Sequence, residues 1–546
     1  MFWEYFLIFC AFFPPLFSLG RMYMPFYPMI GPIPIPIGCI LTALIAWGVW
    51  GIAWHQLGAA IIHGIWFAVE FAFLYFTVAL LLRALMRAGV LRALADYASS
   101  FSDDARIQVL MIAWLGVCAL QGFIGFGASG AIAAIVLVHI GFSPLTSACM
   151  GLLGSLTCSS FSLMGMPIEM GIKVAMEDPI LLEKMGSLSH SLHTICQQIA
   201  LFHGIIGSLV PCVMVLMLTH RDGKLSFTRE GVAALPFAFF AGVAFTVPFI
   251  LTTFYFDYRW ACLIGASIGF LLIRLVCRTG FLVPQEVWPL PKREEVQSQI
   301  LVKQLIRESD ESLSPLQMAL PFILLLTCWS LIYFGDLFDV LPSWKNIGGS
   351  SLHIHLTVFP ALIFLVVTWV CHAFYPKIYR VSYRDAMTVS FWMLQYAPFM
   401  CIMASIYFAT SVNASHIPSM GAIMGQTLAQ IPGNEWWGVF ITPLLGSIFA
   451  YYSGNHIFAD FMLTPFAYSM GQGLKDWGIL FISLQAIGAS ACTLFSMNYL
   501  SGISEPIGRQ GLESQVMGRI SPLVFAYILL VSALGLFFMQ AGIFDI

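Results

Sequence analysis

Apolar runs of about 20 residues recur along the whole chain, and they limit it to a small set of folds. A helix rises about 1.5 Å per residue, so each run is long enough to cross the ~30 Å of hydrocarbon in a bilayer. About 12 such runs can be counted. Only 9% of the residues are charged, against about 25% in soluble domains. The sequence therefore predicts an all-α polytopic membrane protein, surrounded by the lipid bilayer.

Glycine interrupts one of these apolar stretches. Residues 121–130 read Gln-Gly-Phe-Ile-Gly-Phe-Gly-Ala-Ser-Gly, inside an apolar region that covers residues 107–140. Each glycine costs a helix about 1 kcal/mol relative to alanine, so we predict a re-entrant hairpin that is broken in the middle. Residues 438–469 are predicted to form a second hairpin, broken at 451–456. Such breaks point to the binding site of a transporter. Close packing of helices through small residues is the alternative.

The two hairpins occupy equivalent places in the two halves of the chain. Each follows an apolar helix and precedes another helix that ends in small and polar residues. We therefore predict two inverted repeats, with a site near the midplane where the breaks meet. The first transmembrane half covers residues 1–277 and the second covers 315–546. Residues 278–314 are predicted to be a cytoplasmic linker, either a solvated connector or a regulatory segment.

The positions of the basic residues indicate the orientation in the membrane. If the N-terminus lies outside, 19 Lys and Arg residues fall on the cytoplasmic side and 5 on the other, which together account for all 24. Cytoplasmic loops normally carry the excess of basic residues. Both termini are therefore predicted to lie outside.

Several classes of function are not supported by the sequence. The net charge is −3 and no dense basic cluster is present, so we expect no nucleic-acid partner. The 13 cysteines lie mostly in apolar runs without the spacing of metal ligands, and we expect no metal or cofactor. Neither a phosphate-binding P-loop nor a His-Glu-x-x-His motif is present, so we expect a protein that is not an enzyme and has no catalytic residues. Whether it forms a homo-oligomer stays open.

Small and polar residues gather at both breaks and form the predicted substrate site. Free amides at the ends of half-helices suit a carboxylate, whereas the alternative for each hydroxyl is a bond to a carbonyl of its own helix. The predicted substrate-binding residues are Gln121, Gly125, Phe126, Gly127, Ala128, Ser129, Ser159, Ser453, Gly454, Asn455, Ser490 and Thr493. Ser155, Thr157 and Ser160 extend this set along the same helix.

Ionisable residues inside apolar runs are costly, and each is a candidate for proton coupling. The candidates are His456, Asp460, His190, His193 and Glu70. His456 lies in the second break, and Asp460 follows it by one helical turn. His190 and His193 belong to a polar stripe between residues 187 and 198 that resembles a cavity wall, or else they mark the outer end of that helix.

Three motifs resemble the bacterial lactate/glycolate permease family: Gly-Phe-Gly-Ala at 125–128, Gly-Phe-Ser-Pro-Leu at 141–145 and Met-Gly-Met-Pro-Ile at 164–168. The resemblance is specific over residues 121–168 and weaker in the second half. It implies a fold similar to the ion-transporter superfamily, with paired repeats and hairpins, in the bacterial cytoplasmic (inner) membrane. It also implies symport of 2-hydroxy monocarboxylates with protons.

The chain departs from the family pattern at charged positions, as a divergent member would. Gln121 stands where the family usually has Glu, and Ser129 where it has Pro. Asn455 replaces an Asp of the late hairpin, and Thr493 or a neighbour stands in place of a Lys. The leading hypothesis is secondary active transport of a small organic anion, a monocarboxylate such as lactate or glycolate, by proton symport. A sodium-coupled or neutral-solute carrier, a passive channel and a non-transporting homologue remain as alternatives.

Overall fold

A computed structural model describes residues 2–18, 34–220, 223–290, 313–335, 343–344, 354–355, 359–375, 386–387, 397–411, 417–472, 477–505, 507 and 511–543. Most of the predicted linker, from residue 291 to 312, lies outside these ranges. The described part is helical, apart from two strands of two residues each, and this confirms the predicted fold class. The strands β1 (Ser343–Trp344) and β2 (Ile354–His355) pair antiparallel.

The helices of the first half form a long series that includes short π- and 3₁₀-helical segments, labelled η. They are α1 (Phe2–Ser18), α2 (Pro34–Gly48), α3 (Trp54–Arg87), α4 (Val90–Ser99), α5 (Ala105–Val109), η2 (Leu110–Gly116), α6 (Val117–Gln121), α7 (Ala128–Ile140), α8 (Pro144–Ser155), η3 (Ser159–Phe161), α9 (Ser162–Pro167), η4 (Ile168–Lys173), α10 (Val174–Met176), α11 (Pro179–Met185), α12 (Leu188–Gly207), α13 (Val210–Leu218), α14 (Arg229–Tyr255) and α15 (Tyr258–Thr279).

The second half has fewer described helices. They are α17 (Pro315–Phe334), α19 (Phe359–Phe374), α21 (Ala397–Ala409), α22 (Met420–Ala429), α23 (Asn434–Ser453), α24 (His456–Gln472), α25 (Gly478–Thr493), α26 (Met497–Ser504) and α27 (Glu513–Ala541). The arms of the second hairpin, α23 and α24, have 20 and 17 residues and extend beyond the predicted range of 438–469.

The number of helices that can cross a membrane differs from the expected 12. Six helices in the described ranges are long and apolar enough, or seven if the bent pair Pro144–Ser155 and Ser159–Met176 is one span. That pair bends by 68° at its break. The other expected crossings correspond to shorter apolar helices, such as the 15 residues of α2 and the 16 residues of α25. The predicted crossings at 35–54 and 477–495 extend past the ends of α2 and α25, because apolar residues continue beyond these two helices.

Local sequence explains where several of these helices begin and end. The hydroxyl of Ser143 accepts a hydrogen bond from the Thr146 amide, and Pro144 occupies the first turn, so α8 begins with a side-chain cap. Gly141 has a φ of 126°, which a residue with a Cβ adopts only with strain, and α7 ends there. Thr228 caps α14 through the Gly231 amide. These caps fix the turns between consecutive membrane helices.

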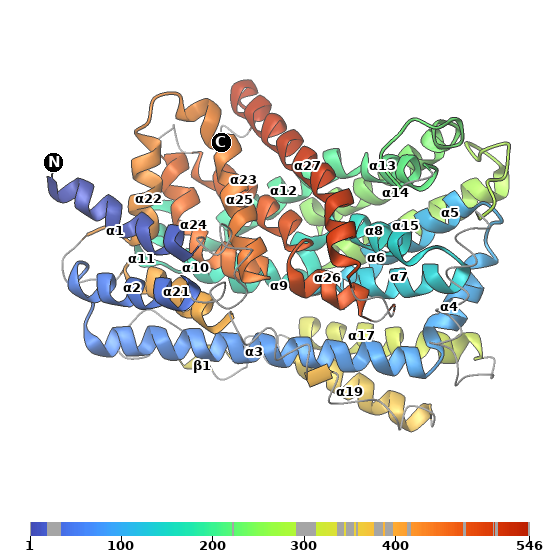
Figure 1. The fold of residues 1–546 in the computed structure, drawn as a ribbon, viewed down its shortest axis with the longest axis horizontal. Helices are drawn as coiled ribbons and strands as arrows, with labels where there is room; N and C mark the ends of the chain where they lie inside the picture. Colours follow the sequence, from blue (N-terminus) through green and yellow to red (C-terminus); the bar gives the residue numbers. More distant parts are fainter. Residues whose placement is uncertain are drawn as a thin grey trace.

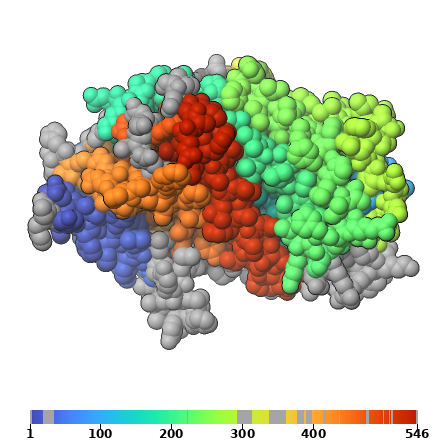
Figure 2. All heavy atoms as spheres, turned by 90° about the horizontal axis from the view of Figure 1, so that it is seen from above, coloured from blue at the N-terminus to red at the C-terminus, as the bar shows by residue number. Residues whose placement is uncertain are grey.

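The second arm of each broken hairpin has similar neighbours within its own half and also contacts the other half. In the first half, α7 packs against α4 and α8, and in the second half α24 packs against α22 and α25. Across the halves, α7 contacts α26, while α24 contacts η4 and α10. The long helix α3 lies along α21 and α19 and extends beneath both halves (Figure 1). Figure 2 shows α27 between the second-half helices and the green helices of the first half.

Candidate functional site

The first break lies between α6 and α7 and holds the backbone in strained conformations. Gly125 and Gly127 have φ values of 61° and 81°, and Phe126 between them has a φ of 48°. Leu163 and Met164 also have positive φ, and the Met164 amide donates to the carbonyl of Gly122 at 2.8 Å. Left-handed backbone at bulky residues is costly and clusters at functional sites. The first break and the turn at 163–165 therefore form one strained unit.

Gln121 and Ser129 face each other across the first break. The Ser129 hydroxyl donates to Gln121 Oε1, and both side chains are fully buried. The amide nitrogen Nε2 of Gln121 makes no hydrogen bond of normal geometry with a described residue, although the Tyr499 side chain lies near enough to interact with Gln121. Buried polar groups are normally paired, so this donor is available to a ligand.

Tyr499 of α26 closes the first break from the other half. A Cβ on Gly127 would lie 3.0 Å from Cδ1 of the Tyr499 ring. No side chain caps the N-terminus of α7 at Gly127, while Ala128 begins the helix and is buried. The glycine thus brings bare backbone against an aromatic ring supplied by the second half.

The second break lies between α23 and α24, at Gly454 and Asn455. Gly454 has a φ of 70°, and Asn455 Oδ1 accepts a hydrogen bond from the Ile457 amide at 3.0 Å. The Ser453 hydroxyl bonds the Asn455 carbonyl at 2.7 Å and the Phe449 carbonyl at 2.8 Å. Asn455 Nδ2 and both ring nitrogens of His456 are buried without a hydrogen-bond partner among the described residues. This break, like the first, leaves buried donors unused.

Asp460 follows His456 by one turn of α24 and lies beside the first half. Its carboxylate accepts a hydrogen bond from Gln485 Nε2 of α25 at 3.0 Å. A Cβ on Gly171 of η4 would lie 2.8 Å from the Asp460 Cβ, so these two elements are in close contact. Gln485 is fully buried, and its Oε1 has no partner in the described ranges.

The two broken helices meet through a chain of side-chain hydrogen bonds. The Ser160 hydroxyl donates to Ser490 Oγ at 2.9 Å, and Ser490 donates to the Ile487 carbonyl at 3.0 Å. Ser160 Oγ also lies 2.9 Å from His203 Nε2, and His203 Nδ1 lies 2.6 Å from the Tyr527 hydroxyl. Because each hydroxyl has one hydrogen, His203 donates from Nε2 and accepts from Tyr527.

Two other predicted hydroxyls bond to backbone carbonyls four residues earlier in the chain. Ser159 Oγ donates to the Ser155 carbonyl at 2.5 Å, and Thr493 Oγ1 donates to the Ala489 carbonyl at 2.9 Å. This is the local bonding that serine and threonine commonly make in apolar helices.

Aromatic side chains of α3 connect the two breaks. The Phe71 ring lies 6.0 Å from the Phe126 ring of the first break and 4.8 Å from the Phe458 ring, two residues after His456. Phe67 lies 5.4 Å from the same Phe458 ring. One phenylalanine of α3, which the sequence did not single out, therefore contacts an aromatic ring at each break.

The remaining proton-coupling candidates lie elsewhere. His190 and His193 are exposed at the start of α12, and His193 Nε2 lies 2.9 Å from Gln197 Nε2. In the buried part of the predicted stripe, Gln198 accepts a hydrogen bond from Ser483 of α25 at 2.9 Å. Glu70 is buried on α3 and accepts from Trp66 Nε1 at 2.8 Å. Within the described ranges, no group of three His, Cys, Asp or Glu residues could hold a metal ion.

Comparison with known proteins places this arrangement among permeases. A sequence model of the family described as L-lactate permease matches residues 8–543. An L-lactate permease of Halalkalibacterium halodurans is 21% identical over 512 residues, which cover 90% of each chain. Glycolate permease GlcA of Escherichia coli is 31% identical over 127 residues, 23% of this chain and 22% of that one. The solved YdaH transporter of Alcanivorax borkumensis matches with a TM-score of 0.36 and 14% identity, over 85% of each chain.

Proposed function

Because the chain belongs to the L-lactate permease family, we propose that it carries a small 2-hydroxy monocarboxylate, such as lactate or glycolate, by proton symport. The proteins that it resembles in sequence are named as permeases for lactate or glycolate, which are small organic anions. The substrate and the coupled proton are the parts of this proposal that need testing. In this proposal the protein crosses the bacterial inner membrane several times, with both termini outside.

The observation that carries the proposal is the set of unused buried donors at the two breaks. Gln121 Nε2, Asn455 Nδ2 and the ring of His456 have no protein partner in the described ranges, and all three residues are at most 2% exposed. Leaving a buried donor unpaired costs about 1–3 kcal/mol, so a ligand that accepts hydrogen bonds from these groups gains stability by binding there. A carboxylate and a hydroxyl group offer the acceptors that these donors lack.

The substrate carboxylate lies near the first break in this proposal. The N-terminus of α7 presents its positive end there, and Gly127 contributes no side chain to cap it. Gly125, Phe126, Ala128 and Ser129 shape the backbone around it, with Gln121 as the side-chain donor. The substrate hydroxyl then lies toward Asn455 of the second break, with Ser453 and Gly454 around it and the Ser160–Ser490 contact beside it.

His456 is the proposed carrier of the coupled proton, with Asp460 next to it. A cation is costly in a buried apolar site unless an anion neutralises it. Proton and carboxylate are therefore expected to enter together as a neutral pair, which is the requirement for symport. His190 and His193, which are exposed at the start of α12, are the runner-up carriers.

The transport movement is proposed to use the two halves, 1–277 and 315–546, as inverted repeats. Two correspondences support this: α7 contacts α26, and α24 contacts η4 and α10. Broken helices that cross near a site can open it to one side and then to the other when one repeat moves. Phe71 of α3 contacts Phe126 and Phe458, and such a movement would change these contacts.

Uptake into proteoliposomes tests the function directly. Purified protein is reconstituted, and labelled lactate and glycolate are offered with an inward proton gradient, an inward sodium gradient or no gradient. Proton symport predicts accumulation that needs the proton gradient and that a protonophore abolishes. Accumulation driven by sodium alone would support the sodium-coupled alternative, which the neutral residues Gln121 and Asn455 favour. Uptake that equilibrates without accumulation in every condition would indicate a passive channel.

A further inference from the structure

A cavity of about 360 Å³ lies at the end of α15, away from both breaks. Its lining combines aromatic side chains of α4 and the following loop, Tyr97 and Phe101, with two arginines of α15, Arg274 and Arg278. Met111 and Cys277 complete its apolar wall. The transport site uses none of these residues.

The two arginines have no counter-ion among the residues that the structure describes. Arg274 lies over the Phe101 ring at 6.0 Å, and neither guanidinium makes a hydrogen bond or an ion pair with a described residue. The described residues that line the cavity include no acidic side chain. Two positive charges one helical turn apart therefore face the same cavity, and no described residue neutralises them. An anion is the ligand that this charge pattern fits.

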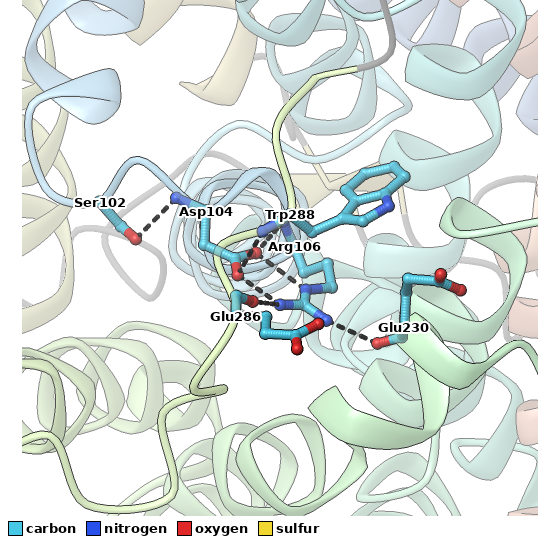
Figure 3. A network of polar contacts seen from close by, with 6 residues as sticks. All are labelled: Ser102, Asp104, Arg106, Glu230, Glu286 and Trp288. Atoms are coloured by element: carbon cyan, nitrogen blue, oxygen red, sulfur yellow. Dashed lines mark hydrogen bonds and ion pairs between the residues drawn. The ribbon is translucent and has the colours of Figure 1, made fainter.

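Arg106, close in sequence to the cavity wall, shows the opposite arrangement. Its guanidinium donates to Asp104, to the Glu230 carbonyl at 2.6 Å and to the Glu286 carbonyl at 2.7 Å (Figure 3). Asp104 also accepts from the Trp288 amide at 3.2 Å, and its own amide bonds Ser102. This network fixes residues 102–106 directly after Phe101. The wall of the cavity is thus held by a fully paired arginine, while Arg274 and Arg278 have no ionic partner in the described ranges.

An exposed apolar surface leads along α15 to the two arginines. Leu271 and Leu275 are 69% and 59% exposed, and each lies three residues before one of the arginines. Residues three apart are neighbours on a helix surface, so each leucine adjoins one guanidinium. A ligand that fits this surface has an anionic head and an apolar tail. A free anion would use the arginines but gain nothing from the leucines.

We propose that this cavity binds an anionic phospholipid, with its phosphate between Arg274 and Arg278 and its acyl chains along Leu271 and Leu275. Both arginines belong to the basic set that the charge distribution assigns to the cytoplasmic side, where juxtamembrane arginines attract anionic lipid headgroups. The aromatic pair Tyr97 and Phe101 then packs against the glycerol region of the lipid. This site is independent of the substrate and of the coupling ion.

Native mass spectrometry of the full chain in detergent tests the proposal. The protein is titrated with phosphatidylglycerol, with phosphatidylcholine or with inorganic phosphate. The test variant is Arg274→Gln/Arg278→Gln, and the matched control is Lys224→Gln/Arg229→Gln, which removes two exposed charges, one before α14 and one at its first residue. A Leu271→Asn/Leu275→Asn variant tests the tail, and Arg274→Lys/Arg278→Lys keeps the charge.

The expected result is selective retention of phosphatidylglycerol, weakened about tenfold or more in the double Gln variant, since each arginine near the membrane surface contributes appreciably. The control should bind as the parent does, and the double Lys variant should bind better than the double Gln variant. Equal binding by the parent and the double Gln variant would overturn the site. If the Lys224→Gln/Arg229→Gln control loses as much lipid binding as the double Gln variant, the binding depends on net charge and not on this cavity. If inorganic phosphate displaces the lipid and the Leu271→Asn/Leu275→Asn variant binds as the parent does, the cavity is a phosphate site and the lipid proposal is wrong.

Discussion

The hydroxyl of Ser160 donates to Ser490 Oγ at 2.9 Å, across 330 residues of sequence. Ser160 lies in the break of the first-half helix, and Ser490 lies one turn before the break that ends α25. The same Ser160 oxygen accepts from His203, which accepts from Tyr527. The contact between the halves is therefore one step of a directed chain, Tyr527 to His203 to Ser160 to Ser490. All four side chains are buried or nearly so.

Replacing Ser160 should destabilise the protein more than replacing Ser490. Ser160→Ala leaves the Nε2 donor of His203 buried without an acceptor, which costs about 1–3 kcal/mol. Ser490→Ala leaves only the Ser160 hydroxyl to find another acceptor and should cost about 1 kcal/mol. Thermal unfolding of the purified variants measures the difference. Ser532→Ala is the control, because that buried hydroxyl bonds only the Ile528 carbonyl of its own helix. If the Ser160→Ala protein is as stable as this control, the hydrogen bonds from Tyr527 to Ser490 do not stabilise the contact between the two halves.

Gly127→Leu should abolish transport while the protein still inserts into the membrane. Gly127 has a φ of 81°, where a residue with a Cβ costs about 1–2 kcal/mol, and the Tyr499 ring lies 3.0 Å from the new Cβ position. The leucine would also fill the space beside the uncapped N-terminus of α7. Uptake and membrane abundance are measured together. Gly125→Leu should act in the same direction, since Gly125 also has a positive φ.

A matched control is available in the same region. A Cβ on Gly502 of α26, one turn after Tyr499, would meet no heavy atom of the described residues within 4 Å outside its own helix. Gly502→Leu should therefore insert and transport nearly normally. Normal uptake by an abundant Gly127→Leu protein would move the substrate site away from the first break.

Sequence was sufficient to predict the helical membrane fold and the positions of both breaks. The glycines at 122–127 could not continue a helix, and the structure ends α6 at Gln121 and resumes at Ala128. Helix lengths were less predictable, because hydropathy does not show where a cap such as Ser143 or a bend such as that after Ser155 ends a helix. The helix that was predicted to follow the first hairpin is in fact a pair, Pro144–Ser155 and Ser159–Met176, bent by 68° at its break.

The partners of the site residues could not be derived from sequence. His203 lies between Phe202 and Gly204 in an apolar helix, and nothing nearby indicates that Ser160 and Tyr527 reach it from 43 and 324 residues away. Phe71 is one of many aromatic residues in α3, and only the fold shows that it contacts both breaks. Ser159, which the sequence favoured, bonds its own helix, whereas its neighbour Ser160 makes the contact between the halves.

Asp104→Asn should strongly destabilise the protein. The Asp104 and Arg106 side chains are only 4% and 2% exposed, so the neutral amide would leave the guanidinium buried without its counter-ion. Removing one partner of a buried ion pair typically costs about 3–5 kcal/mol. The unfolding temperature in detergent measures this loss. Arg229→Gln is the control, because the Arg229–Glu286 pair is 4.0 Å long and nearly 90% exposed, and its loss should be hard to detect. Equal shifts in the two variants would contradict the role of the buried pair.

The pH dependence of substrate binding should identify the group that carries the proton. If His456 is that group, a protonated imidazole attracts the substrate carboxylate, and loss of the proton removes this attraction. Binding of lactate should therefore strengthen as pH falls through the pKa of the histidine, and weaken again where lactate itself becomes protonated. His456→Gln retains a hydrogen-bond donor but cannot titrate in this range. Its binding should be weaker at low pH and should lose the histidine-dependent rise.

Isothermal titration in two buffers of different ionisation enthalpy separates this prediction from a structural role for His456. The parent should take up close to one proton for each lactate bound, because the imidazole and the carboxylate enter the neutral pair together, and His456→Gln should take up fewer. His193→Gln is the matched control, since His193 is exposed at the start of α12 and should leave proton uptake unchanged. If His456→Gln binds lactate with the proton uptake and pH profile of the parent, His456 has a structural role. Asp460→Asn would then be the next variant to measure, because Asp460 is the other ionisable residue beside the second break.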